Sequence, residues 1–332
     1  MESKAFLFIL MWFRAAALNT SSIPVSSPDY CYIESWCDSY AWEVTFQYCR
    51  ADFMLSQSPV NLDPFYMMWN MSMPPLELQD YDVPQTEPWV MKNIRDTVAV
   101  EFNPGMRLRG ANFPGEYQTL YMSFHWGSTY MPGSEHTYNG RRYPMELQII
   151  HILPPYTSVM EAVYLERQAV AILAFFIDIG HEDNPVFEII SSAVPTVPLA
   201  GDEAFLNPFA LRDLLPDDIS KFYRYQGSLT FPDCLFGVEW AVFEEPIYIS
   251  LKQYDRFVSS VYYHEWEEGE EPKLQVMNYR HIHSLFMRVL EASPNASIPF
   301  TSAAPHTHSA THTHTHTALL AALGALLLTT AW

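Results

Sequence analysis

Residues 120–152 contain two β-prone runs, LYMSFHW at 120–126 and MELQIIHI at 145–152, on either side of the segment GSEHT at 133–137. The first run is rich in aromatic residues, and the second alternates in character until the break at Pro154-Pro155. Alternation with a period of two is the pattern of a strand whose side chains face opposite sides. The stretch therefore predicts two strands.

Strand-like runs continue on both sides of this stretch, and helical signals are few. The run AVAILAFFIDI at 169–179 is almost continuously apolar, as in a strand that is covered on both faces. Further strands are expected at 97–102, 238–243 and 247–251, and short helices at 184–193 and 252–260. No repeat or linker interrupts residues 42–292. We predict a single, mainly β (α+β) domain, with an antiparallel or mixed sheet and peripheral helices.

Composition narrows the class of protein further. The 332 residues carry a formal net charge of −20, and 49% of them are hydrophobic. A chain this rich in apolar residues buries a core and is not disordered. Its negative charge opposes binding to nucleic acid or to anionic lipid surfaces. Length alone suggests about two domains, but all-β folds of this size are often one.

The N-terminus reads as a secretory signal. Lys4 precedes the apolar run AFLFILMWF at 5–13, and Ala15-Ala16-Ala17 offers a small-residue cleavage site. The alternative is a buried N-terminal strand or helix. We assign residues 1–17 to the signal and residues 18–29 to a short leader before the domain at 30–295.

The C-terminus reads as the signal for a glycosylphosphatidylinositol (GPI) anchor. Residues 318–332 are uncharged and apolar, and a Ser/Thr/His-rich stalk or spacer at 296–317 precedes them. Fifteen helical residues rise only about 22 Å, which is short of a bilayer core. We predict attachment at Ser302, with Ser309 as the alternative site, and a tail-anchored segment as the other interpretation.

Five of the twelve histidines lie in the repeat HTHSATHTHTHT at 306–317. Histidine-rich tracts sometimes bind metal. Attachment at Ser302 would remove this one with the tail. Seven histidines remain for the body of the protein: His125, His136, His151, His181, His264, His281 and His283.

Cysteines and glycosylation sequons agree with export. An even count of four cysteines, Cys31, Cys37, Cys49 and Cys234, predicts two disulfides with three possible connectivities. The absence of a C-x-x-C pair argues against a zinc ribbon or a thioredoxin-like site. Sequons begin at Asn19, Asn70 and Asn295.

Several motifs, in order along about 250 residues, resemble the α-class carbonic anhydrases. QSPVNL at 57–62 resembles the family's QSP signature, and FHWG at 124–127 with GSEHT at 133–137 resembles its HWG…GSEHT stretch. The matches continue at 143–147 (YPMEL), 214–216 (LLP), 225–230 (YQGSLT) and 278–280 (NYR). The layout is most similar to the secreted and GPI-anchored members.

This resemblance implies a fold and a disulfide pattern. The family fold is a central, twisted, largely antiparallel sheet of ten strands with short peripheral helices. Cys49 and Cys234 stand where secreted and anchored members pair two cysteines, which leaves Cys31–Cys37 as the second bridge.

The family's zinc site is degraded in this sequence. Members hydrate CO₂ with a zinc hydroxide held by three histidines, which leave one coordination position open. The matching positions here are Ser123, His125 and Gln148, so that only His125 is retained. Ser and Gln are weak neutral donors, so we expect no cofactor, and zinc only if the chain is an altered enzyme. A repositioned site using His125, His136 and His151 would need a register change, because His151 faces away from Gln148 on a strand.

The rest of the family pocket is partly kept. Thr230 matches the threonine that orients the zinc-bound hydroxide, and Glu135 matches its acidic partner. Without a metal we expect these two to form a structural hydrogen-bonded pair, and His125 to be a buried core histidine. Phe231 is expected to crowd the pocket. Three further expectations are that Asp96 stands at the proton-shuttle position, that Tyr121 replaces a pocket glutamine, and that Trp126 and Trp240 are core residues.

No other catalytic motif competes, since the sequence has no G-x-S-x-G, no H-E-x-x-H and no phosphate-binding glycine loop. We predict a catalytically inactive, carbonic anhydrase-related binding module at the extracellular face of the cell membrane. Its expected partner is a protein with a basic patch, contacted by the loops at 64–75 and 262–272. The second loop includes the acidic run EWEEGEE at 265–271. The alternative is a carbonate dehydratase, or a weak esterase, with an altered metal site.

Overall fold

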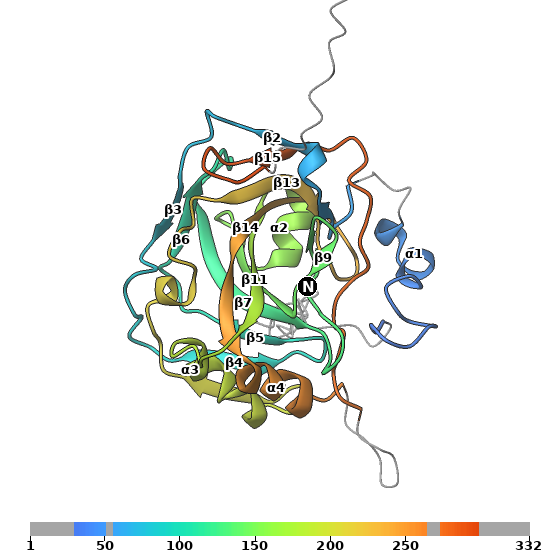
Figure 1. Cartoon of the computed structure of the whole chain (residues 1–332), viewed down its shortest axis with the longest axis vertical. Coiled ribbons are helices and arrows are strands. Elements are labelled where there is room, and N and C mark those ends of the chain that lie inside the picture. Colours follow the sequence, from blue (N-terminus) through green and yellow to red (C-terminus); the bar gives the residue numbers. More distant parts are fainter. Residues whose placement is uncertain (1–29, 51–55, 264–272, 299–332) are drawn as a thin grey trace, which may run out of the picture. The chain divides into compact units, whose positions relative to one another are not determined.

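The computed structural model describes residues 30–50, 56–263 and 273–298 (Figure 1). All of them belong to one compact unit that ends at Pro299. The predicted signal, leader and tail, most of the stalk, Asn19, Ser302, Ser309 and the acidic run at 265–271 lie outside the described residues.

One large sheet organises the domain, as predicted. Within the described residues it has 12 strands, ten of them in one continuous order and two, β3 and β6, to one side. The ten strands are, in order, β12 (Glu203–Leu206), β4 (Trp89–Asn93), β5 (Val98–Glu101), β7 (Tyr117–Trp126), β10 (Met145–Ile152), β11 (Val170–Gly180), β14 (Phe236–Ser250), β13 (Phe222–Ser228), β15 (Leu290–Ala292) and β2 (Met67–Trp69). β3 (Leu76–Gln79) pairs with β6 (Arg107–Gly110), and β6 pairs with β7.

Pairing in this sheet is largely antiparallel. The exceptions among the described strands are the parallel pairs β11–β14 and β15–β2. A small second sheet contains β1 (Asn61–Leu62), β8 (Thr137–Tyr138) and β9 (Arg141–Arg142). Side chains that alternate along the central strands fill two apolar cores, one on each face. Phe124 and Leu147 lie in one core, and Tyr121 and Ile150 lie in the other.

The helices are short and peripheral. They are α1 (Trp42–Thr45), α2 (Val159–Leu165), α3 (Phe187–Ser191) and α4 (Leu251–Ser260), with 3₁₀ turns at Gln47–Cys49, Pro64–Tyr66, Val194–Thr196 and Leu211–Leu214. α3 and α4 lie together at one end of the sheet, where Phe187 packs on Phe257 (Figure 1). None of the helices in the described segments is long and apolar enough to cross a membrane.

Two predicted boundaries are wrong. The runs at 238–243 and 247–251 form one strand, β14, because β11 pairs with both of them and a register shift between Phe175 and Ile177 accommodates the residues between them. The helix expected at 184–193 covers only Phe187–Ser191, since its N-cap is Val186 and a 3₁₀ turn follows its end. Oδ1 of Asn184 accepts from the backbone N–H of Phe187, which turns the chain before the helix. α4 begins close to the prediction, with a capping box formed by Ser250 and Gln253.

Both predicted disulfides form, Cys31–Cys37 and Cys49–Cys234. The longer bridge ties the N-terminal segment to the loop that follows β13. Residues 30–49 carry α1 and lie to one side of the sheet (Figure 1).

Candidate functional site

Strand register brings the degraded ligand positions together. On the paired strands β7 and β10, Ser123 lies directly opposite Gln148, and His125 lies directly opposite Glu146. Directly opposed residues share a face of the sheet, as do residues two apart on one strand. The four side chains therefore point to the same side.

Three of them, Ser123, His125 and Gln148, form the floor of a cavity of about 280 Å³. Seven of the residues singled out from the sequence line it: Asp96, Tyr121, Ser123, His125, Gln148, Thr230 and Phe231. Glu135 is fully buried and is not among the lining residues. The aromatic ring of Phe231 borders the cavity, as expected.

Two glycines bring the segment with Glu135 against the end of β7. A Cβ atom on Gly133 would lie 1.8 Å from the backbone nitrogen of Gly127. Only glycine permits backbones to approach this closely. The backbones of the FHWG and GSEHT motifs thus contact each other at Gly127 and Gly133, and Glu135 lies two residues after Gly133.

His125 is a buried, hydrogen-bonded histidine. Its Nδ1 donates to the carbonyl oxygen of Asn278 at 2.7 Å, which leaves Nε2 as the atom 3.7 Å from Glu135. Asn278 also accepts from the backbone N–H of Trp126 at 2.7 Å. The motif NYR at 278–280 therefore fixes the orientation of the one imidazole at the cavity floor.

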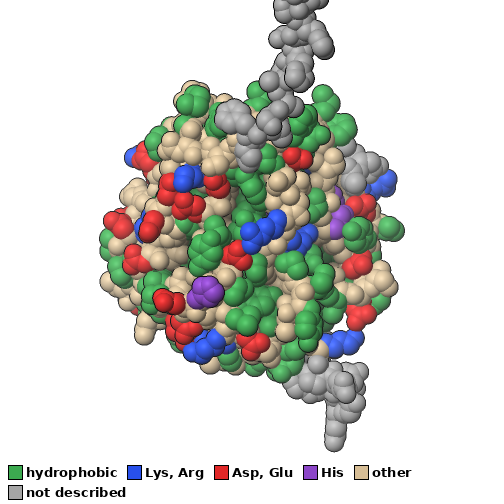
Figure 2. Space-filling view, in the orientation of Figure 1, with side chains coloured by type: hydrophobic (Ala, Val, Ile, Leu, Met, Phe, Trp, Pro, Cys, Tyr) green, Lys and Arg blue, Asp and Glu red, His purple; other side chains and the backbone are tan. Residues whose placement is uncertain are grey.

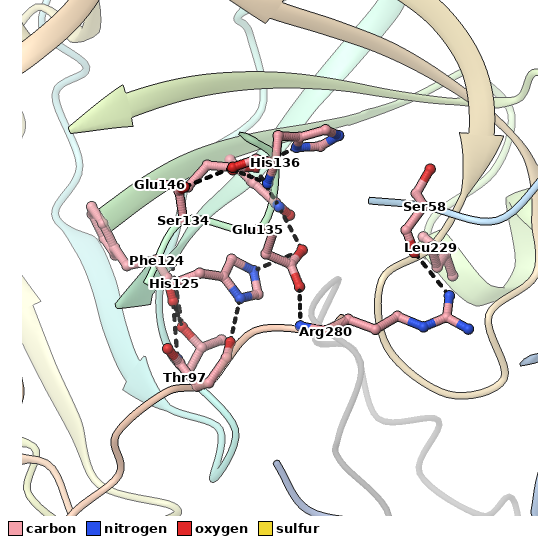
Figure 3. A network of polar contacts seen from close by, with 12 residues as sticks. Ser58, Thr97, Phe124, His125, Ser134, Glu135, His136, Glu146, Leu229 and Arg280 are labelled. Atoms are coloured by element: carbon pink, nitrogen blue, oxygen red, sulfur yellow. Dashed lines mark hydrogen bonds and ion pairs between the residues drawn. The ribbon is translucent and has the colours of Figure 1, made fainter. Parts of the chain in front are cut away.

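The side-chain amide of Gln148 is hydrogen-bonded to two buried carboxylates. Its Nε2 donates to Glu135 at 2.9 Å and to Glu146 at 3.0 Å. The second oxygen of Glu135 accepts from the backbone N–H of Arg280 at 3.0 Å. Figure 3 shows Glu135 between His125 and Arg280. In the described part of the chain these are the hydrogen bonds of Glu135, and none of them comes from Thr230, so the predicted Glu135–Thr230 pair is not formed.

Glu146 is the second carboxylate of this network, and the sequence alone assigned it no role. Burial acts to raise its pKa, but the adjoining His136 outweighs this and holds the pKa below its ordinary value. The Nδ1 and backbone N–H of His136 both donate to Glu146, at 2.9 and 2.8 Å (Figure 3). Glu146 lies two residues before Gln148 on the same strand, so its side chain was predictable on the same face as Gln148.

The network extends through His136 to the next strands. Nε2 of His136 lies 2.7 Å from the hydroxyl of Tyr225, which lies 2.9 Å from Ser58. Burial raises the pKa of Tyr225, so it acts as a neutral hydroxyl. Both ring nitrogens of His136 have hydrogen-bond partners, so His136 is a structural residue of the core.

His151 faces the other side of the sheet, as predicted. Its Nδ1 donates to the carbonyl of Ala171 at 3.1 Å, and its Nε2 accepts from the hydroxyl of Tyr81 at 2.7 Å. Burial lowers its pKa to about 3. His125, His136 and His151 therefore have separate partners, and the repositioned zinc site is not formed.

The N-terminal segment lines the mouth of the cavity, a feature that sequence reasoning missed. Tyr30, Tyr32 and Phe46 all border the cavity, and the hydroxyl of Tyr30 donates to Asp96. Arg95 also binds Asp96, at 3.1 Å. Burial raises the pKa of both tyrosines well above the ordinary value, with the Asp96 carboxylate adding to it. The carboxylate at the shuttle position is therefore paired within the protein.

The residues at the floor do not fit a zinc ion. One imidazole faces the cavity, and the amide nitrogen of Gln148 is bonded to two carboxylates. The remaining donors, a serine hydroxyl and an amide oxygen, are not ligands that hold Zn²⁺ in known sites, which use Cys, His and Asp or Glu.

Trp126 and Trp240 are fully buried core residues, as expected.

The fold and the site together define a β-sheet scaffold with a partly apolar cavity beside a buried carboxylate network. Residues 37–294 match the family model of eukaryotic-type carbonic anhydrase. The chain therefore belongs to the eukaryotic-type carbonic anhydrase family.

Curated relatives agree with this assignment. Carbonic anhydrase 15 of Mus musculus is 32% identical over 283 residues, which cover 82% of this chain and 86% of that protein. Carbonic anhydrase 12 of Homo sapiens is 29% identical over 254 residues, or 76% of this chain and 70% of that protein. Receptor-type tyrosine-protein phosphatase zeta of Homo sapiens is 31% identical over 214 residues, but these are only 9% of that protein. Domains of this kind thus occur as separate proteins and within larger ones.

Proposed function

We propose that this chain is a catalytically inactive carbonic anhydrase-related protein that acts as a binding module at the cell surface. The observation that carries the proposal is the floor of the cavity. Gln148 donates both to Glu135 and to Glu146, where the family places a zinc-binding histidine. The amide satisfies two buried carboxylates without any metal.

The mouth of the cavity supports the same conclusion. Tyr30, Tyr32 and Phe231 place aromatic rings around it, and Asp96 is bound by Tyr30 and Arg95. A carboxylate held by a tyrosine and an arginine is not free to take up and release protons, as a shuttle must. In this proposal the cavity has neither the family's three zinc histidines nor an efficient route for protons.

Extracellular localisation rests on the two disulfides and on the chain ends. Disulfides persist in oxidising compartments. We propose that residues 1–17 are a signal peptide, that a GPI anchor joins at Ser302 or Ser309, and that Asn70 and Asn295 carry glycans. The side chain of Asn295 is exposed and that of Asn70 is half-buried.

The proposed contact surface lies at the β2 edge of the sheet. β2 pairs with β15, with Met67 to Trp69 beside Leu290 to Ala292, and Met68 borders the same pocket as Val289. The side chain of Phe65 is 75% exposed and that of Met287 is 84% exposed. Large apolar side chains exposed together mark interaction surfaces, and Figure 2 shows hydrophobic side chains at the surface among acidic ones. The proposed partner is a protein that offers an apolar surface flanked by basic groups.

Metal content and CO₂ hydration test the loss of catalysis. We expect the purified full chain to show no hydration above the buffer rate, with or without added Zn²⁺. The double variant Ser123→His with Gln148→His should gain one zinc per chain at the floor. Inhibitor-sensitive hydration by the wild type that disappears in His125→Ala would contradict the proposal.

Surface variants test the binding role. Labelled protein should bind to cells that display the partner, and Phe65→Asp with Met287→Glu should abolish this binding. Phe205→Asp is the matched control, since Phe205 is 80% exposed on β12 at the opposite end of the strand order. Equal binding by the double variant and the control would exclude this surface.

The retained cavity supports one alternative, a weak esterase or a carbonate dehydratase with an altered metal site. His125 and Thr230 both border a space large enough for a small substrate. Hydrolysis of an activated acetate ester that is abolished by His125→Ala would favour this alternative. Hydrolysis unchanged by that substitution would exclude it.

A further inference from the structure

Two histidines outside the cavity lie side by side on an extended segment. The backbone N–H of His283 donates to Pro59 at 2.9 Å, and His283 forms a parallel bridge with Val60. Residues two apart on extended chain share a side. The rings of His281 and His283 accordingly lie 4.4 Å apart.

A carboxylate from the N-terminal segment completes the cluster. Oε1 of Glu43, on α1, lies 3.3 Å from Nε2 of His281. One potential ligand atom from each of Glu43, His281 and His283 lies within 4.8 Å of the other two. In the described part of the chain this is the one group of three or more such residues that could hold a metal ion.

Neighbouring residues hold His281 in place. The hydroxyl of Ser39 lies 2.9 Å from Nδ1 of His281, and the ring of Tyr40 stacks on the imidazole at 4.1 Å. In the tautomer whose Nδ1–H donates to Ser39, Nε2 carries no proton and can bind a metal ion beside Glu43. A hydrogen bond of this kind on the second ring nitrogen is typical of metal-bound histidine.

His283 supplies an independent sign of a ligand. Its side chain is only 7% exposed, and its Nε2 is buried without a hydrogen-bond partner among the described residues. A buried polar atom left unsatisfied costs about 1–3 kcal/mol. A bound cation would satisfy this atom.

We propose that Glu43, His281 and His283 bind a divalent transition-metal ion of the zinc type, which clamps the N-terminal segment to the segment before β15. Two imidazoles and one carboxylate form a known zinc donor set, whereas Ca²⁺ and Mg²⁺ take oxygen ligands. The side chain of Glu43 is 33% exposed, which leaves a coordination position for water. None of the three residues lines the cavity.

Binding requires a small closure of the cluster. Ligand atoms bound at about 2.0–2.1 Å in a tetrahedral site lie about 3.3 Å apart. The half-exposed Glu43 side chain on a four-residue helix can make most of this movement. The guanidinium of nearby Arg280 does not occupy the site, since it donates to Gln57, Ser58 and Cys49.

Metal titration of the full chain tests the proposal. The background protein has the five histidines at 306–316 changed to Asn, which removes the tail as a source of binding. After treatment with a chelator, we expect it to take up one Zn²⁺, and Co²⁺ to give the visible absorption of a four-coordinate site. His283→Ala and Glu43→Gln should each weaken binding at least tenfold and abolish the cobalt spectrum.

Controls separate this site from others and from misfolding. His181→Ala, at an exposed position, and His125→Ala, in the cavity, should bind as the background does. Zn²⁺ should raise the melting temperature of the background but not of Glu43→Gln, whose melting without metal should match the background. No uptake by the background, or uptake that Glu43→Gln and His283→Ala leave unchanged, would overturn the proposal. Uptake lost only in His125→Ala would instead identify zinc in the cavity.

Discussion

The side-chain amide of Gln148 lies 2.9 Å from the carboxylate of Glu135 and donates a hydrogen bond to it. The same amide nitrogen binds Glu146 at 3.0 Å, so that one neutral residue serves two fully buried acids. Each oxygen of Glu135 and Glu146 therefore has a donor, and Gln148 supplies two of these hydrogen bonds. These contacts are consistent with a scaffold that stays folded without metal.

Gln148→Glu should destabilise the protein strongly. A third buried carboxylate would face Glu135 and Glu146 and would have to be protonated or repelled. We expect the free energy of unfolding at pH 7 to fall by about 3 kcal/mol or more, measured by urea denaturation. Gln118→Glu is the control, because Gln118 is half-exposed on β7 opposite Arg107 and should change stability little. Equal stabilities of the two variants would contradict the network.

The two disulfides should contribute unequally to stability. Cys49–Cys234 spans 185 residues and Cys31–Cys37 spans 6. In the chain-entropy description, removal of the long bridge costs about 5 kcal/mol and removal of the short one about 2 kcal/mol. Urea denaturation of the paired Cys→Ala variants measures the difference. A larger loss from the short bridge would show that packing of residues 30–37, rather than chain entropy, dominates.

His151 should make stability fall in mild acid. Its pKa is about 3 in the folded protein and has an ordinary value of about 6.5 in the unfolded chain. Between pH 3 and pH 6.5 the unfolded chain binds a proton at this histidine and the folded protein does not. The free energy of unfolding is therefore unaffected by His151 above pH 6.5 and falls as the pH is lowered from 6.5 toward 3. The expected loss from this residue is about 2 kcal/mol at pH 5 relative to pH 7.5.

His151→Gln isolates that contribution, because glutamine does not titrate. Urea midpoints at pH 7.5, 6 and 5 should fall less steeply for the variant than for the wild type. Parallel curves would mean that His151 is protonated in the folded state, which would contradict its bonds to Tyr81 and Ala171.

The predicted anchor should be removable by an enzyme. A phosphatidylinositol-specific phospholipase should release the protein from cells, and the released chain should lack Trp332 by mass spectrometry. A chain that ends at Thr317 should instead be secreted into the medium. Protein that stays on the membrane after phospholipase treatment, with residues 318–332 intact, would support a membrane-inserted tail.

Local patterns in the sequence were sufficient for the central strands and for the ligand positions. β7, β10 and β11 alternate or run apolar over eight residues or more, and long strands of this kind give a periodic signal. Their family motifs located Ser123, His125 and Gln148. Short edge strands such as β2 and β15 have three residues each, too few for a period to emerge.

By itself the sequence determined the mainly β class, the family and the even set of cysteines, and it predicted that two of the three zinc-ligand positions are not histidine. Only the tertiary structure decided which groups meet: Gln148 with Glu135 and Glu146, Tyr30 with Asp96, and Glu43 with His281. The members of these pairs are on different strands or segments, up to 238 residues apart. Hydrogen bonds between distant residues depend on register and on side-chain direction, which no local pattern encodes. The sequence therefore predicted which residues stand at the zinc-ligand positions, and the fold showed which contacts those residues make.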